Sequence, residues 1–247
     1  MRGYVMMTYA RCGGTWLSQL LGSVGTLGRP EDWFNGQGYR DRGIADYPLD
    51  HAGQRAAMLS LGRTPNGVFG VKLSPLRFDD LAGYDWSEGL GDFAFVHLVR
   101  RDRLARALSD AKARQTRQYR STSPVRGIAH YDAAMIDHAL RTQADDEGRA
   151  QRYFAANGIV PLEIAYEDLL ARTELEIRRI ADHLGEHGPV RLDYGKIDLR
   201  IQSDALNAAW RERFVAERGR LAHMDSPTRA PWRALARRVR GWAVRGG

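Results

Sequence analysis

Short apolar segments alternate along the chain with longer stretches in which apolar residues recur every three or four positions. The apolar segments are residues 4–9 (YVMMTY), 68–73 (VFGVKL), 93–99 (FAFVHLV) and 162–166 (LEIAY). The third is apolar almost throughout, which is typical of a strand that is covered on both faces in a parallel sheet. The pattern therefore predicts four strands.

The stretches between these segments predict helices, because their apolar residues fall on one helical face. Such positions are Leu17, Leu20, Leu21 and Val24, then Leu104, Leu108 and Ala111, then Tyr131, Met135, Ala139 and Leu140. Thr173 and Glu176 have the spacing of a capping box before an apolar stripe that stops at Gly185. Strands that alternate with helices predict an α/β fold, a parallel sheet with helices on both faces. Residues 35–63 and 185–200 lack this periodicity, and we expect long loops there.

Composition narrows the class of protein. The 247 residues are 43% hydrophobic, which is enough for one α/β domain, and we expect residues 1–223 to form it. The single cysteine, Cys12, excludes a disulfide scaffold or a cysteine-based metal cluster and is compatible with the reducing cytoplasm. No apolar run reaches the ~18 residues of a transmembrane helix, and the N-terminus lacks the layout of a signal peptide. We therefore expect a cytoplasmic protein.

The positive charge is concentrated at the C-terminus. The net charge is +7, and residues 224–247 contribute +5 of it through six arginines and one aspartate. Trp232, Leu235, Val239 and Trp242 give these residues an apolar stripe, so they predict a basic amphipathic tail. A solvated helix on the body of the protein and a helix on a membrane surface or partner are both open. Since residues 1–223 carry only +2, we expect no nucleic-acid partner.

The loop after the first strand reads ARCGGTW over residues 10–16 and leads into a helix. Its glycines allow backbone N–H groups to turn toward an anion, and the helix N-terminus adds unpaired N–H groups. Arg11 and Thr15 add a charged donor and a hydroxyl. The loop lacks the lysine of a Walker A motif, the spacing of G-x-G-x-x-G, and the arginine that a phosphatase places six residues after its cysteine. A phosphate-type cradle and an ordinary tight turn are the two interpretations of this loop alone.

The same loop resembles the P-R-S-G-[ST]-T loop of sulfotransferases, and the chain is similar in particular to the bacterial trehalose 2-sulfotransferase family. Further stretches that match follow in order over roughly residues 4–215. They are residues 28–34 (GRPEDWF), 62–73 (GRTPNGVFGVKL), 100–102 (RRD), 107–109 (ALS), 115–117 (QTR), 158–162 (GIVPL), 166–169 (YEDL) and 200–204 (RIQSD). The resemblance implies a P-loop-like sulfotransferase fold and 3′-phosphoadenosine 5′-phosphosulfate (PAPS) as sulfuryl donor. It does not extend to the tail.

The resemblance also implies a donor site. The first loop would hold the 5′-phosphosulfate, and an arginine at a strand end with a serine on the next helix would hold the 3′-phosphate. The residues at these positions are Arg11, Cys12, Gly13, Gly14, Thr15 and Trp16 in the loop, Arg100 or Arg101 with Ser109, and further along Arg200 and Gln202. The chain departs from the pattern at Ala10, Cys12 and Gly14, where the family usually has proline, serine, and serine or threonine.

For catalysis, the resemblance implies a carboxylate that takes the proton of the acceptor hydroxyl during in-line attack on sulfur. Asp32 occupies that position, where the family usually has glutamate, and its neighbour Glu31 is the second candidate. Arg11 would oppose the developing negative charge, and Lys72 is placed to reach the donor or the acceptor. We expect no metal, because the seven histidines show no HExxH spacing, and we expect His97 to lie in the core.

Two other functions are weighed against this one. A P-loop kinase or nucleotide hydrolase requires a loop lysine that is missing here. A degenerate nucleotide-binding module without transfer activity stays open because of Cys12, Gly14 and Asp32. For the sulfotransferase, the acceptor would be a carbohydrate, a glycolipid or a related small molecule. The family suggests a homodimer, and peripheral membrane contact through the basic tail would favour a glycolipid.

Overall fold

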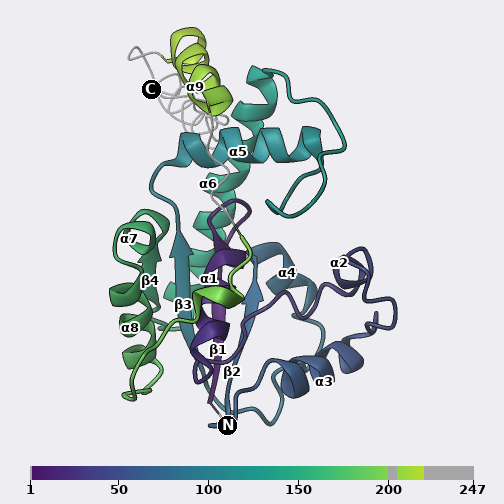
Figure 1. Ribbon diagram of the computed structural model, residues 1–247, viewed down its shortest axis with the longest axis vertical. Coiled ribbons are helices and arrows are strands. Elements are labelled where there is room, and N and C mark those ends of the chain that lie inside the picture. Colours follow the sequence, from purple (N-terminus) through teal and green to yellow (C-terminus); the bar gives the residue numbers. More distant parts are fainter. Residues whose placement is uncertain (1, 200–204, 220–247) are drawn as a thin grey trace, which may run out of the picture. The chain divides into compact units, whose positions relative to one another are not determined.

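The computed structural model describes residues 2–199 and 205–219. Four parallel strands, β1 (Arg2–Met7), β2 (Val68–Leu73), β3 (Phe93–Val99) and β4 (Leu162–Ala165), form a sheet in the order β2-β1-β3-β4 (Figure 1). The predicted α/β fold with a parallel sheet is confirmed. The second and third strands match their predicted bounds, whereas β1 ends two residues and β4 one residue earlier than expected.

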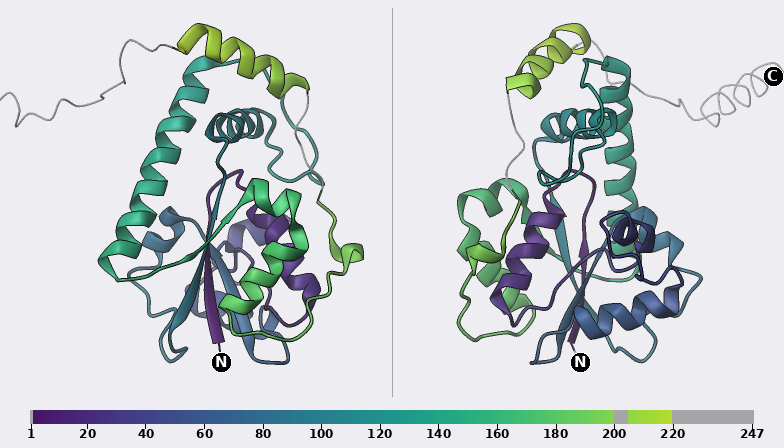
Figure 2. Two further views of the ribbon diagram at one scale, coloured as in Figure 1. Left: turned by 90° about the vertical axis from the view of Figure 1, so that its left-hand side faces the viewer. Right: turned by 45° about the vertical axis from the view of Figure 1, so that its right-hand side comes forward.

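Helices cover both faces of this sheet, as Figure 2 shows in its left panel. On one face lie α1 (Gly14–Val24), α7 (Tyr166–Ala171) and α8 (Thr173–His183), and on the other lie α4 (Pro75–Asp80) and α6 (Ala133–Ala156). The central strand β1 pairs with β2 and β3, so that Val5 lies beside Val71 and Phe95. Since both faces are covered, β1 and β2 are apolar nearly throughout; the charged exceptions are Arg2, which is exposed at the start of β1, and Lys72, which is buried in β2.

The expectation of a long loop at residues 35–63 was wrong. This region contains α2 (Gly36–Arg40) and α3 (His51–Leu61). These helices are marked by capping side chains at their N-termini and not by an apolar stripe. The N-cap Asn35 accepts a hydrogen bond from the Gly38 N–H, and the N-cap Asp50 accepts one from the Gly53 N–H. A short 3₁₀ helix, η1 (Tyr194–Lys196), interrupts residues 185–200. The remaining helices of the described residues are α5 (Arg103–Thr116) and α9 (Ala205–Arg218).

The predicted capping box at the start of α8 was also wrong. The residue that caps α8 is Arg172, which makes no side-chain cap, and the Thr173 hydroxyl donates to the Leu169 carbonyl at 2.8 Å. Since α7 ends just before α8, Thr173 already has a helical carbonyl within reach. The Glu176 carboxylate is buried and pairs with Arg172 and Arg179, which compensates its loss of hydration.

The chain divides into two compact units, Met1–Arg211 and Glu212–Gly247. The sheet and the helices around it belong to the first. The expected boundary after residue 223, the basic tail of residues 224–247, and Arg200 and Gln202 lie outside the described residues. Within residues 2–199 and 205–219, no helix combines the length and apolar character needed to cross a membrane.

Candidate functional site

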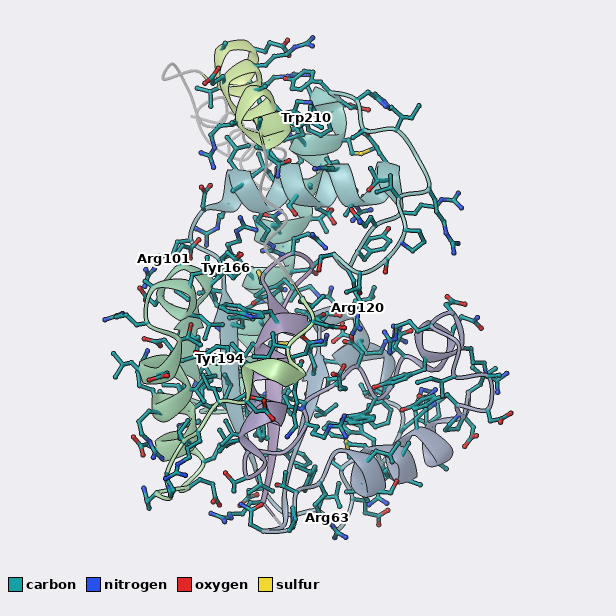
Figure 3. All side chains as sticks on the ribbon, in the orientation of Figure 1. Arg63, Arg101, Arg120, Tyr166, Tyr194 and Trp210 are labelled. Carbon is teal, nitrogen blue, oxygen red and sulfur yellow. The ribbon has the colours of Figure 1, made fainter. Side chains whose placement is uncertain are left out.

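A cavity of about 800 Å³ opens where the four strands end. The first residue after each strand lines it: Thr8 after β1, Ser74 after β2, Arg100 after β3 and Tyr166 after β4. In Figure 3, Tyr166 and Arg120 lie near these carboxyl ends, whereas Arg63 lies at the opposite end of the sheet. This is the edge at which open parallel sheets bind their ligands.

The loop between β1 and α1 forms the floor of this cavity. Arg11 and Gly13 both have left-handed backbone angles, with φ of 63° and 85°. Glycine is required at position 13, because a Cβ there would lie 2.6 Å from the ring of Tyr166. The first helical hydrogen bond runs from the Leu17 N–H to the Gly13 carbonyl, so the preceding N–H groups of α1 have no helical partner. Such a loop at a helix N-terminus is a site for an anion.

Two arginines and a serine come together beside the loop. Arg11 donates from Nε to the Ser109 hydroxyl at 2.9 Å, and Arg100 donates from Nη1 to the Arg11 carbonyl at 3.1 Å. The Arg100 guanidinium also lies 4.7 Å from the ring centre of Tyr166, and its buried Nε has no partner among the described residues. Burial lowers the pKa of Arg11 from its usual value, and Asp110 opposes that shift. The arrangement gathers cationic donors where an anionic ligand would neutralise them.

The two neighbouring arginines of the sequence therefore separate. Arg100 lines the cavity, whereas the exposed Arg101 pairs with Asp168, with 3.0 Å between Nη1 and Oδ1. Figure 3 shows Arg101 at the outer margin of the view. The backbone N–H of Arg101 is also engaged, by Glu167 at 3.1 Å.

Asp32, the carboxylate expected to act as a base, forms an ion pair with Lys72. Lys72 Nζ lies 2.7 Å from Asp32 Oδ2 and donates to the Thr15 hydroxyl at 3.2 Å. The Lys72 side chain is only 6% exposed, and Asp32, Lys72 and Thr15 all line the cavity. Glu31 does not line it; its carboxylate lies 3.9 Å from Arg120. The structure thus brings Asp32, and not Glu31, to the anion-binding loop.

A family model described as Stf0 sulphotransferase matches residues 3–217. The chain belongs to the Stf0 sulphotransferase family.

Two relatives of this Stf0 protein are trehalose 2-sulfotransferases. The protein from Mycobacterium tuberculosis is 28% identical over 89% of this chain and 97% of its own length. That from Mycolicibacterium smegmatis is 25% identical over 85% of this chain and 93% of its own length. Among solved structures, the sulfotransferase domain of the Synechococcus PCC 7002 olefin synthase covers 90% of each chain, with 15% identity and a TM-score of 0.46. Retinol dehydratase in complex with androsterone and inactive cofactor PAP covers 92% of this chain and 84% of its own, with 14% identity and the same TM-score.

Not every residue expected at the site faces the cavity of the Stf0 protein. Gly13, Gly14, Thr15 and Trp16 line it with Arg11, but the Cys12 side chain is fully buried beneath the loop. Burial raises the pKa of the Cys12 thiol to about 11. Since the thiolate is the reactive form, Cys12 is not suited to act as a nucleophile.

We expect Cys12 to resist alkylation in the folded protein. At pH 8 a thiol with that pKa is ionised in about one molecule in a thousand, and its burial blocks access as well. Iodoacetamide followed by intact-mass measurement should give almost no adduct for native protein and complete modification in guanidinium chloride. Because Cys12 is the only cysteine, rapid labelling of the native protein would contradict its burial.

His97 lies in the core beside the cavity. Its ring is buried, and its Nε2 lies 2.7 Å from the hydroxyl of Tyr9, which lines the cavity. Burial lowers the pKa of His97 and raises the pKa of Tyr9, so at neutral pH a neutral phenol and a neutral imidazole share this hydrogen bond. His97 thereby orients Tyr9. Within residues 2–199 and 205–219, no cluster of three or more His, Cys, Asp or Glu is arranged to hold a metal ion.

Several cavity residues were missed by sequence reasoning. Thr8 and Tyr166 fell inside the predicted strands, and Ser74 carried no motif. A usable signal existed, namely that the residue directly after each parallel strand faces the ligand edge. Trp33 and Phe34 both pack in the core; the Trp33 indole donates to the Gly70 carbonyl at 3.1 Å, and of the two only Phe34 lines the cavity.

Proposed function

We propose that this protein transfers a sulfuryl group from PAPS to a hydroxyl of a carbohydrate, a glycolipid or a related small molecule. The observation that carries the proposal is the position of the Asp32–Lys72 pair, which adjoins the anion-binding loop through Thr15. One cavity thus contains a proton acceptor and the cationic surroundings that an anionic donor requires. Membership in the Stf0 family supports the same reaction.

The residues present fit PAPS, which carries a 3′-phosphate and a 5′-phosphosulfate. The N–H groups at the start of α1, with Arg11 and Thr15, would hold the 5′-phosphosulfate. Arg100 and Ser109 would hold the 3′-phosphate, and the buried, unpartnered Nε of Arg100 is a donor that such a phosphate would satisfy.

Aromatic side chains near these donors offer a surface for the adenine ring. Trp16 contacts Tyr166 edge to face, with 6.4 Å between ring centres, and Tyr194 of η1 lines the same cavity. We propose that the purine stacks on this aromatic surface.

The donor, when bound, supplies the sulfuryl group that the acceptor oxygen attacks in line. Asp32 accepts the proton of the acceptor hydroxyl as the new bond forms. Taking up that proton neutralises Asp32 and leaves the charge of Lys72 unbalanced beside Thr15. That positive charge, Arg11 and the loop N–H groups oppose the negative charge that builds up on the transferred group and the leaving phosphate.

The acceptor would occupy the part of the cavity beyond Asp32. Phe34, Asn35, Ser74, Arg77 and Arg120 line it there and offer one apolar face with several hydrogen-bond donors. Such a combination suits a sugar ring, which has apolar faces and a polar rim. The two curated relatives are named for a sugar acceptor, which supports a carbohydrate or a glycolipid as the class.

The donor site is tested with 3′-phosphoadenosine 5′-phosphate (PAP), the desulfated donor, by calorimetry. We expect Arg100→Gln to weaken PAP binding by about tenfold or more, because a hydrogen bond to a charged group contributes about 1.5–3 kcal/mol. Arg101→Gln is the matched control, since it removes the same group one residue away and outside the cavity, and we expect a change below about twofold.

Three results would contradict parts of this assignment. Absence of PAP binding by the folded wild-type protein would refute PAPS as donor. A loss on Arg101→Gln with none on Arg100→Gln would mean that the 3′-phosphate binds elsewhere. Tight PAP binding without sulfate transfer to any acceptor would favour the degenerate nucleotide-binding module instead.

A further inference from the structure

Thr8 lines the cavity and has a buried hydroxyl group that no described residue engages. It is the first residue after β1, and its backbone N–H donates to the Leu73 carbonyl at 2.9 Å, which fixes its position between β1 and β2. The residue is 6% exposed and lines the cavity. Its Oγ1 is buried and has no hydrogen-bond partner within the described part of the chain. A buried hydroxyl in this state costs stability unless a ligand or water satisfies it.

Gly14 leaves the space that the Thr8 side chain occupies. A Cβ at position 14 would lie 3.0 Å from Cγ2 and 3.1 Å from Oγ1 of Thr8, and 3.4 Å from Cδ of Lys72. Unlike Gly13, Gly14 has no left-handed backbone angle that would call for glycine. These two positions therefore share one space: a side chain at position 14 would crowd Thr8, which would have to shift to make room.

The groups around that shared space are donors. Lys72, whose Cδ would lie 3.4 Å from a Cβ at position 14, donates to the Thr15 hydroxyl. Gly14 itself begins α1, whose first N–H groups have no helical partner. The Thr8 hydroxyl has a hydrogen to donate, and no described residue accepts it. The ligand that satisfies it supplies an acceptor atom, and an anionic oxygen is the acceptor that the neighbouring charges favour.

We propose that the Thr8 hydroxyl donates a hydrogen bond to the 5′-phosphate end of the donor, and that Gly14 is glycine because Thr8 supplies this hydroxyl. The inference rests on the proposed function, because it assumes that the loop holds the donor's 5′ group. It assigns Thr8, directly after β1, as a donor-binding residue.

The experiment compares two ligands and removes one hydroxyl. PAP has the 5′-phosphate and adenosine 3′-phosphate lacks it, so the second ligand reports on the rest of the site. We expect Thr8→Val, which keeps the shape but removes the hydroxyl, to weaken PAP binding about tenfold and to leave adenosine 3′-phosphate within about twofold. Thr8→Ser, the control that keeps the hydroxyl, should bind PAP nearly as the wild type does.

A reciprocal exchange tests the shared space. Gly14→Ser alone should weaken PAP binding, because the new Cβ crowds Thr8. Thr8→Ala alone should weaken it by loss of the hydroxyl. The double variant Thr8→Ala with Gly14→Ser should bind PAP more tightly than either single variant, because it returns one hydroxyl to the space without the crowding.

The outcomes separate this inference from the proposed function. Unchanged PAP affinity in Thr8→Val, or an equal loss for both ligands, would overturn the role of the hydroxyl while the donor site stands. Additive losses in the double variant would overturn the exchange. Failure of the wild-type protein to bind PAP would refute the proposed function itself, and Thr8 with it. Circular dichroism of each variant confirms that it is folded.

Discussion

Asp32→Asn is expected to lower the rate of sulfuryl transfer by about 10²–10⁴-fold while PAP binding changes little. The amide is nearly the same size and keeps an oxygen toward Lys72 Nζ, 2.7 Å away in the wild type, but it cannot take up the acceptor proton. Single-turnover transfer assays with PAPS and an acceptor identified by screening sugars measure the rate, and calorimetry with PAP measures the binding.

Glu31→Gln is the matched control for this prediction. It removes a carboxylate one residue away whose side chain does not line the cavity, so the transfer rate should change less than about threefold. Equal losses in the two variants would show that the rate depends on charge near the loop rather than on a proton acceptor. Asp32→Glu, which restores a carboxylate with a longer reach, should recover much of the rate.

Arg106→Met is expected to lower the free energy of unfolding by about 3 kcal/mol or more. The Arg106 side chain is 2% exposed; it donates to the Glu147 carboxylate at 3.0 Å and to the Ala10 carbonyl at 2.9 Å. It also lies 4.9 Å from the ring centre of Tyr9. Methionine fills part of the volume but leaves a largely buried carboxylate with one fewer cation. Urea denaturation of both proteins measures the difference.

The control for Arg106 is an arginine in an exposed pair. Arg141 lies on α6, as Glu147 does, and pairs with Asp137 one turn away at 3.0 Å, with both side chains substantially exposed. Arg141→Met should therefore cost less than about 1 kcal/mol. If the two variants were equally stable, the buried Arg106–Glu147 pair would contribute no more to stability than an exposed pair. The contacts of Arg106 with Glu147 of α6 and with the Ala10 carbonyl would then not stabilise the fold.

Much of the sheet could be predicted because its strands are bounded by strong local signals. A Pro-Asn-Gly turn precedes β2 and the polar run from Arg100 follows β3, and both were predicted to the residue. By contrast, Thr8, Tyr9 and Tyr166 are residues that strands also favour, so the ends of β1 and β4 were placed too late. That error hid Thr8 and Tyr166, because each was counted as part of a strand instead of as part of the ligand edge.

Sequence motifs predicted the cavity-lining residues that lie within them. Residues that only the fold brings to the cavity carried no such motif and were missed. The loop at residues 10–16, Asp32 and Ser109 lie together at the cavity, apart from the buried Cys12 side chain. The choice between Arg100 and Arg101 could not be made from two identical neighbours, since it depends on the residue at which β3 ends. The pairing of Lys72 with Asp32 joins residues 40 positions apart and has no local signal.

The backbone contact between Glu31 and β2 determines how an inserted residue would change the acid that faces Lys72. Glu31 forms a parallel bridge with Val71 at the free edge of β2, and the Lys72 N–H donates to the Glu31 carbonyl at 2.9 Å. Since extended residues alternate sides, Asp32 and Lys72 then point the same way, and Glu31 points away. The register of this bridge thus decides which acid is the proposed base: one residue added before Glu31 would place Glu31 beside Lys72 and turn Asp32 away.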